Sequence, residues 1–277
     1  MLKFLFGDIW YYGMIIGESG TVHMGVLALM ILAVAAVAYL LGNVNTAIIL
    51  TKLIYKEDIR TKGSGNAGMT NVMRTYGWVP AVSTLLGDML KCMMAMIAGT
   101  LIYGLNGAYI AGLFCVLGHI APVVYKFKGG KGVASSAMFI LYVSPISFGV
   151  IVLIFVLIVF GTKYLSLASV MCILMMPLIV NKIESAIDLP IDLPLRLIIM
   201  LIIAALVVFM HRANIKRIMN KTESKFHFKR TVKKSEGVMP LSDEAEYDED
   251  LAEEEELTEE VIKRKEINRK KSAKKKK

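Results

Sequence analysis

The stretch that decides the fold is GHIAPVVYKFKGGKG, residues 118–132, which joins one apolar run to another that starts at Val133. It gathers three lysines and three glycines, namely Lys126, Lys128, Lys131, Gly129, Gly130 and Gly132. Glycine lets the backbone approach a ligand closely, and N–H groups at a helix start suit an anion, especially beside a lysine. One interpretation is a phosphate-binding loop at membrane depth. The other is a basic cytoplasmic loop with flexible glycines, and this stretch alone leaves both open.

The 277-residue chain is too apolar for an ordinary soluble domain. Hydrophobic residues make up 56% of it, and uncharged runs such as 197–210 are typical of membrane spans. The net charge of +9 does not by itself indicate nucleic-acid binding, because many of the charged residues, of both signs, lie in a C-terminal tail. Cys92, Cys115 and Cys172 lie in apolar runs without metal-ligand spacing, so we expect buried thiols and no metal site. We expect no removable signal peptide, because no small-residue cleavage site is evident near the start.

The order of apolar and charged segments predicts three parts. Residues 1–22 are rich in aromatic side chains and predict an interfacial lead-in, and residues 23–226 form a multi-span domain. Residues 227–277 contain an acidic block and then a basic block, which cannot bury a core, so we expect a disordered cytoplasmic tail. The basic end of this tail either contacts anionic lipid or is merely solvated.

Charge bias and one proline determine the predicted topology. Lysine and arginine favour the cytoplasmic side, which places the groups around Lys56, Lys131 and Arg217 on the same side. An even number of crossings must then separate the last two groups, although only three apolar runs are visible there. Pro145 divides residues 133–162 into a short and a longer segment, because proline interrupts a helix. The expected spans are residues 25–50, 78–102, 107–126, 133–143, 146–162, 164–182 and 194–210, with a turn at 103–107.

The chain is thus predicted to be an all-α membrane protein with seven transmembrane helices, some of them short. Its N-terminus lies outside and its C-terminus lies in the cytoplasm. The eleven-residue segment is shorter than the roughly 20 residues that cross at full thickness, so we expect it to be tilted or packed within protein. A five-span arrangement, in which 133–162 is one crossing and one later run does not cross, is the alternative.

A second polar cluster, residues 58–74, lies on the same predicted side. It contains Ser64, Asn66, Thr70, Asn71 and Arg74 just before a span. Arginine offers a planar fork to phosphate, and hydroxyl and amide groups add neutral hydrogen bonds. The alternative is a glycine-rich loop in which Ser64, Asn66 or Thr70 caps a helix. We favour anion binding, because the cluster contains more hydrogen-bond donors than the capping of one helix requires.

A third cluster, HRANIKR at 211–217, follows the last span. Lys216 and Arg217 fit a positive-inside anchor. His211 and Asn214 are three residues apart and share a helical face. Taken alone, His211 is more often an interfacial histidine than a catalyst.

Two polar pairs lie in or beside the spans. Asp88 and Lys91 share a helical face within a predicted span, where ionisable groups mark either a functional site or a buried pair, and we favour the pair. Ser166 and Ser169 either reach a shared pocket or bond to their own helix backbone. The sequence contains no G-x-S-x-G, H-E-x-x-H or G-x-x-x-x-G-K-[ST] motif, so a covalent enzyme is not indicated.

These stretches resemble the bacterial acyl-phosphate:glycerol-3-phosphate acyltransferases, the PlsY family. The resemblance rests on GSGNAGMTNVMR at 63–74, GHIAP and FKGGKGVA within 118–134, and HRANIKR at 211–217. DMLK at 88–91 and YLSLAS at 164–169 also fit the family pattern. The chain departs from that pattern at Met69, Cys92 and Thr222, and none of these changes removes a polar site residue.

The resemblance implies a seven-span enzyme of the bacterial cell membrane whose active site faces the cytoplasm. Such an enzyme transfers an acyl group from acyl phosphate to the 1-hydroxyl of glycerol 3-phosphate and yields lysophosphatidic acid, in the first step of bacterial phospholipid synthesis. It needs no cofactor or metal. Its partners are the two substrates and the bilayer, and nucleic acid is not among them.

The family's functional residues carry over to this chain by position. Arg74, Lys131 and His211 are the expected catalytic groups. The expected binding groups are Ser64, Asn66, Thr70 and Asn71 for phosphate, the backbone of Gly129 and Gly130 for phosphate, Asn214 for glycerol 3-phosphate, and Ser169 for the acyl-phosphate site.

The chemistry of acyl phosphate fits this set. It is a mixed anhydride and already activated, so orientation of the reactants, worth roughly 7–11 kcal/mol, can supply most of the acceleration. Cationic groups offset charge on the departing phosphate. Either His211 or a substrate phosphate takes the proton; we favour the phosphate, because His211 lies among cations. The rival functions are transport of an organic phosphate, disfavoured because the clusters share one face, and a scaffold acting through the charged tail.

Overall fold

The computed structural model describes residues 24–186 and 193–226, and every regular element in this part is helical. The α-helices are α3 (Met24–Asn43), α4 (Thr46–Ile54), α5 (Met69–Tyr76), α6 (Trp78–Ile120), α7 (Val133–Val143), α8 (Pro145–Thr162), α9 (Leu165–Ala186), α10 (Leu193–Met210) and α11 (Arg212–Met219). Two 3-10 turns, η1 (Ile59–Thr61) and η2 (Val123–Tyr125), lie between them. The predicted lead-in, 1–22, and the predicted tail, 227–277, lie outside the described residues.

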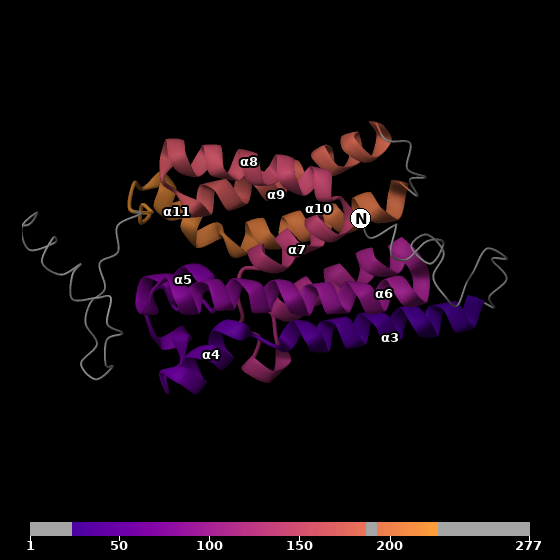
Figure 1. Cartoon of the computed structure of the whole chain (residues 1–277), viewed down its shortest axis with the longest axis horizontal. Coiled ribbons are helices and arrows are strands. Elements are labelled where there is room, and N and C mark those ends of the chain that lie inside the picture. Colours follow the sequence, from indigo (N-terminus) through magenta and orange to yellow (C-terminus); the bar gives the residue numbers. More distant parts are fainter. Residues whose placement is uncertain (1–23, 187–192, 227–277) are drawn as a thin grey trace, which may run out of the picture. The chain divides into compact units, whose positions relative to one another are not determined.

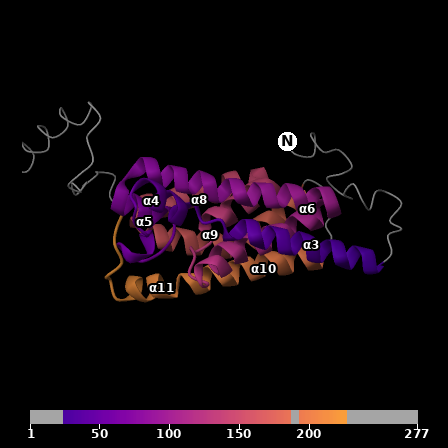
Figure 2. The same ribbon diagram turned by 90° about the horizontal axis from the view of Figure 1, so that it is seen from below.

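The long helices form two groups. Helix α3 packs along α6, and α9 packs against both α8 and α10 (Figure 1). Helix α10 also contacts α6. Helix α7 contacts both groups, through α6 on one side and through α8 and α9 on the other. The short helices α4, α5 and α11 gather at the same end in both views (Figures 1 and 2). That end carries all three polar clusters.

The long helices are apolar on the surface as well as in the core. On α8, for example, Leu153, Leu157 and Phe160 are exposed, which suits contact with lipid rather than water. In the described part of the chain, four helices are long and apolar enough to cross a membrane, or five if α10 and α11 count as one bent span. Helices α10 and α11 meet at an angle of 56°.

Helix α6 is a hairpin of two helices. Tyr103 and Gly104 have non-helical backbone angles, and the chain reverses there. The backbones of Gly99 and Gly107 then touch so closely that a Cβ atom on either would overlap the other's carbonyl group. The prediction of two apolar helical segments separated by a turn near residues 103–107 is confirmed.

The other predicted helix boundaries agree only in part with those of the structure. Pro145 is the first residue of α8, and non-helical Ser144 separates it from α7, as predicted. The expected span at 25–50 lies within the candidate span Gly25–Ile54, but its helix is interrupted. The side chain of Asn45 accepts a hydrogen bond from the Ile48 N–H group (3.0 Å) and starts a new helix, α4. The expected helix at 107–126 ends at Ile120, because Pro122 restricts the preceding residue.

Asp88 and Lys91 form a buried ion pair, 2.9 Å apart, as predicted. Lys91 Nζ also lies 2.9 Å from Nδ1 of His119, and Asp88 accepts a hydrogen bond from the Thr46 N–H group. The pair therefore joins the two halves of α6 to the start of α4. The ring of His119 in turn packs against Gly130, where a Cβ atom would overlap it, so this cluster also supports the loop before α7.

Candidate active site

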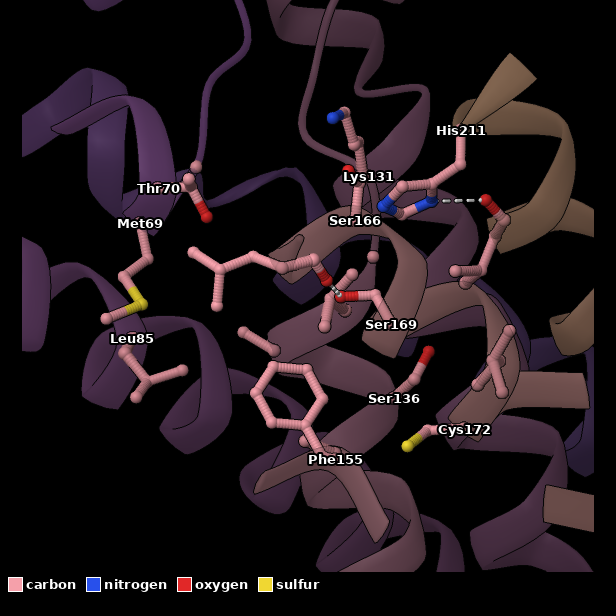
Figure 3. A pocket seen from close by; sticks show the side chains of 18 of the residues that line it. Met69, Thr70, Leu85, Lys131, Ser136, Phe155, Ser166, Ser169, Cys172 and His211 are labelled. Atoms are coloured by element: carbon pink, nitrogen blue, oxygen red, sulfur yellow. Dashed lines mark hydrogen bonds between the residues drawn. The ribbon is translucent and has the colours of Figure 1, made fainter. Parts of the chain in front are cut away.

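A cavity of about 520 Å³ opens among α5, α6, α7, α8, α9 and α10, which is the size range of small-molecule sites (Figure 3). It brings together members of all three predicted clusters. The polar residues that line it include Ser64, Asn66, Thr70, Asn71, Arg74, Lys131, Ser166, Ser169, His211, Asn214, Arg217 and Glu223. Gly129 and Gly130 are the predicted site residues that do not line it.

The loop before α5 is shaped by Asn71. Its side-chain amide donates to the carbonyl groups of Ile59, Lys62 and Asn66, and its oxygen accepts from the Ser64 N–H group. The amide group is thus fully engaged by the loop, so Asn71 holds the loop in place and the expectation that it binds phosphate is not supported. The alternative that Ser64, Asn66 or Thr70 caps α5 is wrong, because Gly68 is the N-cap and no side chain bonds there.

Arg74 is the cation that this loop and α5 present to the cavity. Its side chain is exposed and makes no hydrogen bond or ion pair with the residues the structure describes. Ser64, Asn66 and Thr70 line the same side of the cavity. This side therefore offers a guanidinium group whose five donors are free for an anion.

Lys131 connects the second cluster to the third. Its Nζ atom donates to Oδ1 of Asn214 at 2.7 Å, although the two residues are 83 positions apart in sequence. Burial lowers the pKa of Lys131 to about 8, and the positive charges of Arg217 and Arg74 add to this effect, whereas Glu223 opposes it. The amine is thus still mostly protonated at neutral pH and responds to a nearby anion.

The backbone N–H groups of Gly129 and Gly130, which were predicted to contact phosphate, donate hydrogen bonds within the protein. The Gly129 N–H group donates to the carbonyl group of Ile120 (3.2 Å), and the Gly130 N–H group donates to that of His119 (3.1 Å). These bonds satisfy carbonyl groups at the end of α6. The pair thus fixes the loop that carries Lys131, and the expected phosphate contact from these two N–H groups stays a prediction.

Glu223 organises the third cluster. One carboxylate oxygen accepts from Ser166 and from Asn214 (2.6 Å each), and the other accepts from Arg217 (2.7 Å). Burial by itself would raise the pKa of Glu223, but these hydrogen bonds outweigh it and hold the pKa below its usual value. The carboxylate fixes the Asn214 amide so that its oxygen faces Lys131. Sequence reasoning missed this role, although a lone acid within a strongly basic segment was a usable signal.

His211 lies at the bend between α10 and α11. Its Nδ1 atom is 2.7 Å from the carbonyl oxygen of Val207, so Nδ1 carries a hydrogen and Nε2 of the neutral ring is an acceptor. Burial lowers the pKa of His211, and the charge of Lys131 lowers it further, which favours this neutral form. The imidazole ring lines the cavity together with Lys131 and Ser166 (Figure 3).

The cavity changes from polar to apolar as it enters the helices. Besides the polar residues, it is lined by aliphatic and aromatic side chains of the long helices and α7, among them Leu85, Met89, Ile140, Phe148, Ile151 and Phe155. Ser169 also lines the cavity, but its hydroxyl group donates to the Leu165 carbonyl group of its own helix (2.9 Å). Such a shape suits a molecule with an anionic head and a hydrocarbon chain.

Comparisons with known proteins agree with this arrangement. A family model described as glycerol-3-phosphate acyltransferase matches residues 32–221. A glycerol-3-phosphate acyltransferase of Finegoldia magna is 40% identical over 203 residues, which cover 73% of this chain and 98% of the relative. One from Clostridioides difficile is 41% identical over 198 residues, covering 69% and 93%.

Two solved structures also match. They are crystal structures of PlsY, an integral membrane glycerol 3-phosphate acyltransferase, in its glycerol 3-phosphate form and its lysophosphatidic acid form. Each is 32% identical to this chain and covers 71% of it; the TM-scores are 0.64 and 0.63, with 96% and 95% of the solved chains covered. Sequence, fold and membrane-type helices thus agree, and the chain belongs to the glycerol-3-phosphate acyltransferase family of integral membrane enzymes.

Proposed function

We propose that this protein transfers an acyl group from acyl phosphate to the 1-hydroxyl of glycerol 3-phosphate. The products are lysophosphatidic acid and inorganic phosphate. The names of the relatives support the acceptor, and the solved structure in a lysophosphatidic acid form supports the product. The donor is inferred from the cavity, where Arg74 and Lys131 have no carboxylate partner in the described residues and an apolar channel follows. The sequence contains none of the motifs for a covalent acyl intermediate named above.

The observation that carries this proposal is the contact between Lys131 and Asn214 at the polar end of the cavity. Arg74 lines the same cavity from α5. Two cations from separate parts of the chain, Arg74 and Lys131, therefore line one cavity. Two phosphate-bearing molecules could bind there together, because each anion would have at least one cation and several neutral donors.

The reaction needs no nucleophile from the protein. The 1-hydroxyl oxygen of glycerol 3-phosphate attacks the acyl carbonyl carbon, and an ester C–O bond forms while the C–O bond to phosphate breaks. The leaving phosphate takes the hydroxyl proton and departs as hydrogen phosphate. Lys131 and Arg74 offset the charge that gathers on this phosphate, and the cavity walls hold the reacting atoms in line.

We assign His211 the role of orienting the acceptor. Its Nε2 atom can accept a hydrogen bond from the glycerol hydroxyl, because Nδ1 is engaged by Val207. The lowered pKa of His211 makes it a weak base, which agrees with proton transfer to phosphate. Ser64, Asn66, Thr70 and Asn214 supply neutral hydrogen bonds to the two head groups.

We also propose the membrane topology that this role requires. The chain crosses the bacterial cell membrane seven times, with its N-terminus outside and its C-terminus in the cytoplasm. The two halves of α6 and the short helix α7 support this count, because they add apolar segments to the long helices α3, α8, α9 and α10. The cavity then opens to the cytoplasm, where both charged substrates are found. The predicted tail contact with anionic lipid stays a prediction.

The test is a reaction with purified protein in detergent or vesicles. With acyl phosphate and radiolabelled glycerol 3-phosphate, labelled lysophosphatidic acid and inorganic phosphate should form in equal amounts. Acyl thioesters of the same chain length, supplied in place of acyl phosphate, should give no product. Turnover of the thioesters alone would contradict the proposed donor. Uptake of glycerol 3-phosphate into vesicles without acylation would instead favour transport.

A further inference from the structure

Ser136 has a buried hydroxyl group that nothing in the described structure satisfies. The residue is only 1% exposed, and its Oγ atom has no hydrogen-bond partner among the described residues. Buried hydroxyl groups are almost always hydrogen-bonded, because desolvation without a partner costs about 1–3 kcal/mol. Ser136 also lines the cavity, so a bound molecule can supply the missing partner.

The position of Ser136 along α7 is informative. Gly132, Ser136 and Ile140 are spaced four residues apart, so they share one helical face, and all three line the cavity. Gly132 follows Lys131 at the polar end, and Ile140 belongs to the apolar part. Ser136 lies about 6 Å along the helix from each of them, given a rise of about 1.5 Å per residue. Figure 3 shows its side chain together with Ser169 and Cys172, which line the same cavity.

Three other hydroxyl and thiol groups that line the cavity already donate hydrogen bonds within the protein. Ser169 donates to the Leu165 carbonyl group, Cys172 to that of Ile151, and Ser166 to the Glu223 carboxylate. The Ser136 hydroxyl group is thus a donor that stays available where the cavity turns from polar to apolar.

We propose that the Ser136 hydroxyl group donates a hydrogen bond to the carbonyl oxygen of the acyl donor. This inference rests on the proposed function. A donor with its phosphate near Lys131 and its hydrocarbon chain near Ile140 must place the junction between head and chain beside Ser136. The carbonyl group is the acceptor at that junction. Its oxygen becomes negative when the glycerol hydroxyl attacks, so the hydrogen bond strengthens in the transition state.

A phosphate group fits this position poorly. Arg74 and Lys131 lie toward the polar end, whereas Ile140, Phe155 and Cys172 also line the cavity on the apolar side. One neutral hydroxyl group cannot offset the desolvation of a doubly charged anion. A carbonyl oxygen needs only one donor.

Ser135 provides a matched control. It is the preceding residue of α7, it is fully buried, and its hydroxyl group also lacks a hydrogen-bond partner in the described residues. It does not line the cavity. Replacing either serine by alanine removes one buried hydroxyl group from the same turn of α7. Only the change at Ser136 alters the wall of the cavity.

The first experiment compares turnover in purified Ser136→Ala and Ser135→Ala proteins. We expect kcat with acyl phosphate to fall about 100-fold in Ser136→Ala, in the range seen for loss of one oxyanion donor. Ser135→Ala should stay within about twofold of the parent, and Ser136→Thr should recover part of the loss because it restores a hydroxyl group. Equal activities of the two alanine variants would overturn the proposal.

The second experiment measures binding, so it does not depend on an active variant. The parent protein should bind a 2-oxoalkylphosphonate about tenfold more tightly than an alkylphosphonate of equal length, because only the former carries the carbonyl group. Ser136→Ala should lose this preference and Ser135→Ala should keep it. A preference that persists in Ser136→Ala overturns the assignment. Failure of the parent protein to use acyl phosphate or bind either phosphonate overturns the proposed function, and this inference with it.

Discussion

Two buried polar clusters near the same loop differ in one respect. In the cluster of Asp88, Lys91 and His119, the charged groups close on one another and on backbone atoms, although Asp88 and His119 also line the cavity. In the network of Lys131, Asn214 and Glu223, the hydrogen bonds end at a wall of the cavity. The first arrangement stabilises the fold, whereas the second leaves cations facing an open volume. Buried charge beside a cavity therefore does not by itself mark a site; a cation that no carboxylate pairs with does.

The largest expected effect separates the cavity cations from other basic residues. Lys131→Ala or Arg74→Ala should lower kcat/KM by about 1,000-fold or more, because a charge that stabilises the departing phosphate is lost. The measurement is turnover of purified protein that has been shown to be membrane-inserted and folded. Lys128→Ala is the control, because Lys128 is exposed and does not line the cavity. Full activity of either cavity variant would remove the site assignment.

Glu223→Ala should have the next largest effect. It would leave Ser166, Asn214 and Arg217 without an acceptor, and hydrogen bonds to a charged group are worth about 1.5–3 kcal/mol each. We expect kcat/KM to fall about 10- to 100-fold, together with a lower unfolding temperature. Glu223→Gln should retain more of both properties. Parent-like kinetics in Glu223→Ala would show that Asn214 does not need this support.

His211→Ala tests the orienting role within the same network. The KM for glycerol 3-phosphate should rise about tenfold, as expected for loss of one hydrogen bond of roughly 1.4 kcal/mol, with a smaller change in kcat. Steady-state kinetics at saturating acyl phosphate measure both constants. A pure loss of kcat at saturating glycerol 3-phosphate would make His211 the general base instead.

The pH dependence should reflect the lowered pKa of Lys131. Only the protonated amine attracts phosphate, and its pKa in the free protein is about 8. The kcat/KM for acyl phosphate should therefore fall as the pH rises above about 8. In Lys131→Arg, which stays charged, this decline should move to higher pH. An unchanged decline in that variant would assign the titration to another group.

The smallest effect on turnover is expected in the closed cluster. Asp88→Ala leaves Lys91 as an unpaired buried charge and should destabilise the protein by about 3–5 kcal/mol. The double change Asp88→Leu with Lys91→Met should be less destabilising than the single change. The activity of the folded fraction of the double variant should stay within a few-fold of the parent. Thermal unfolding in detergent measures the destabilisation. A large loss of kcat in the folded double variant would place this cluster in the active site.

The sequence was sufficient for features that depend on local rules. Pro145 and the glycines of the α6 hairpin interrupt helices by their backbone properties, so their positions were predicted. The distribution of lysine and arginine predicted that the polar clusters lie on one side of the membrane, and Arg74, Lys131 and His211 line one cavity. Features that depend on neighbours distant in sequence were not predicted. Asn71 and the Gly129–Gly130 pair looked like ligands because their partners, carbonyl groups of η1 and α6, are revealed only by folding.

Ser136 and Glu223 were missed for a related reason. A serine inside an apolar helix normally bonds to the preceding turn, so its sequence context gives no sign that the hydroxyl group is free. Glu223 lies 57 residues from Ser166, and their contact depends on the turn after α11. The usable signals were two hydroxyls at the start of an apolar helix and one acid among many bases.

The central claim is that three separate polar clusters form one cavity for two phosphate-bearing substrates. It is tested most directly by cysteine accessibility in sealed vesicles. In a background that lacks Cys92, Cys115 and Cys172, single cysteines replace Met69, Val133 and Ser224, uncharged cavity residues beside each cluster. We predict that all three react with a membrane-impermeant maleimide from the cytoplasmic side, and that an acyl-phosphate analogue with glycerol 3-phosphate protects all three. Labelling of any one from the opposite side, or protection of one cluster without the others, would contradict the account.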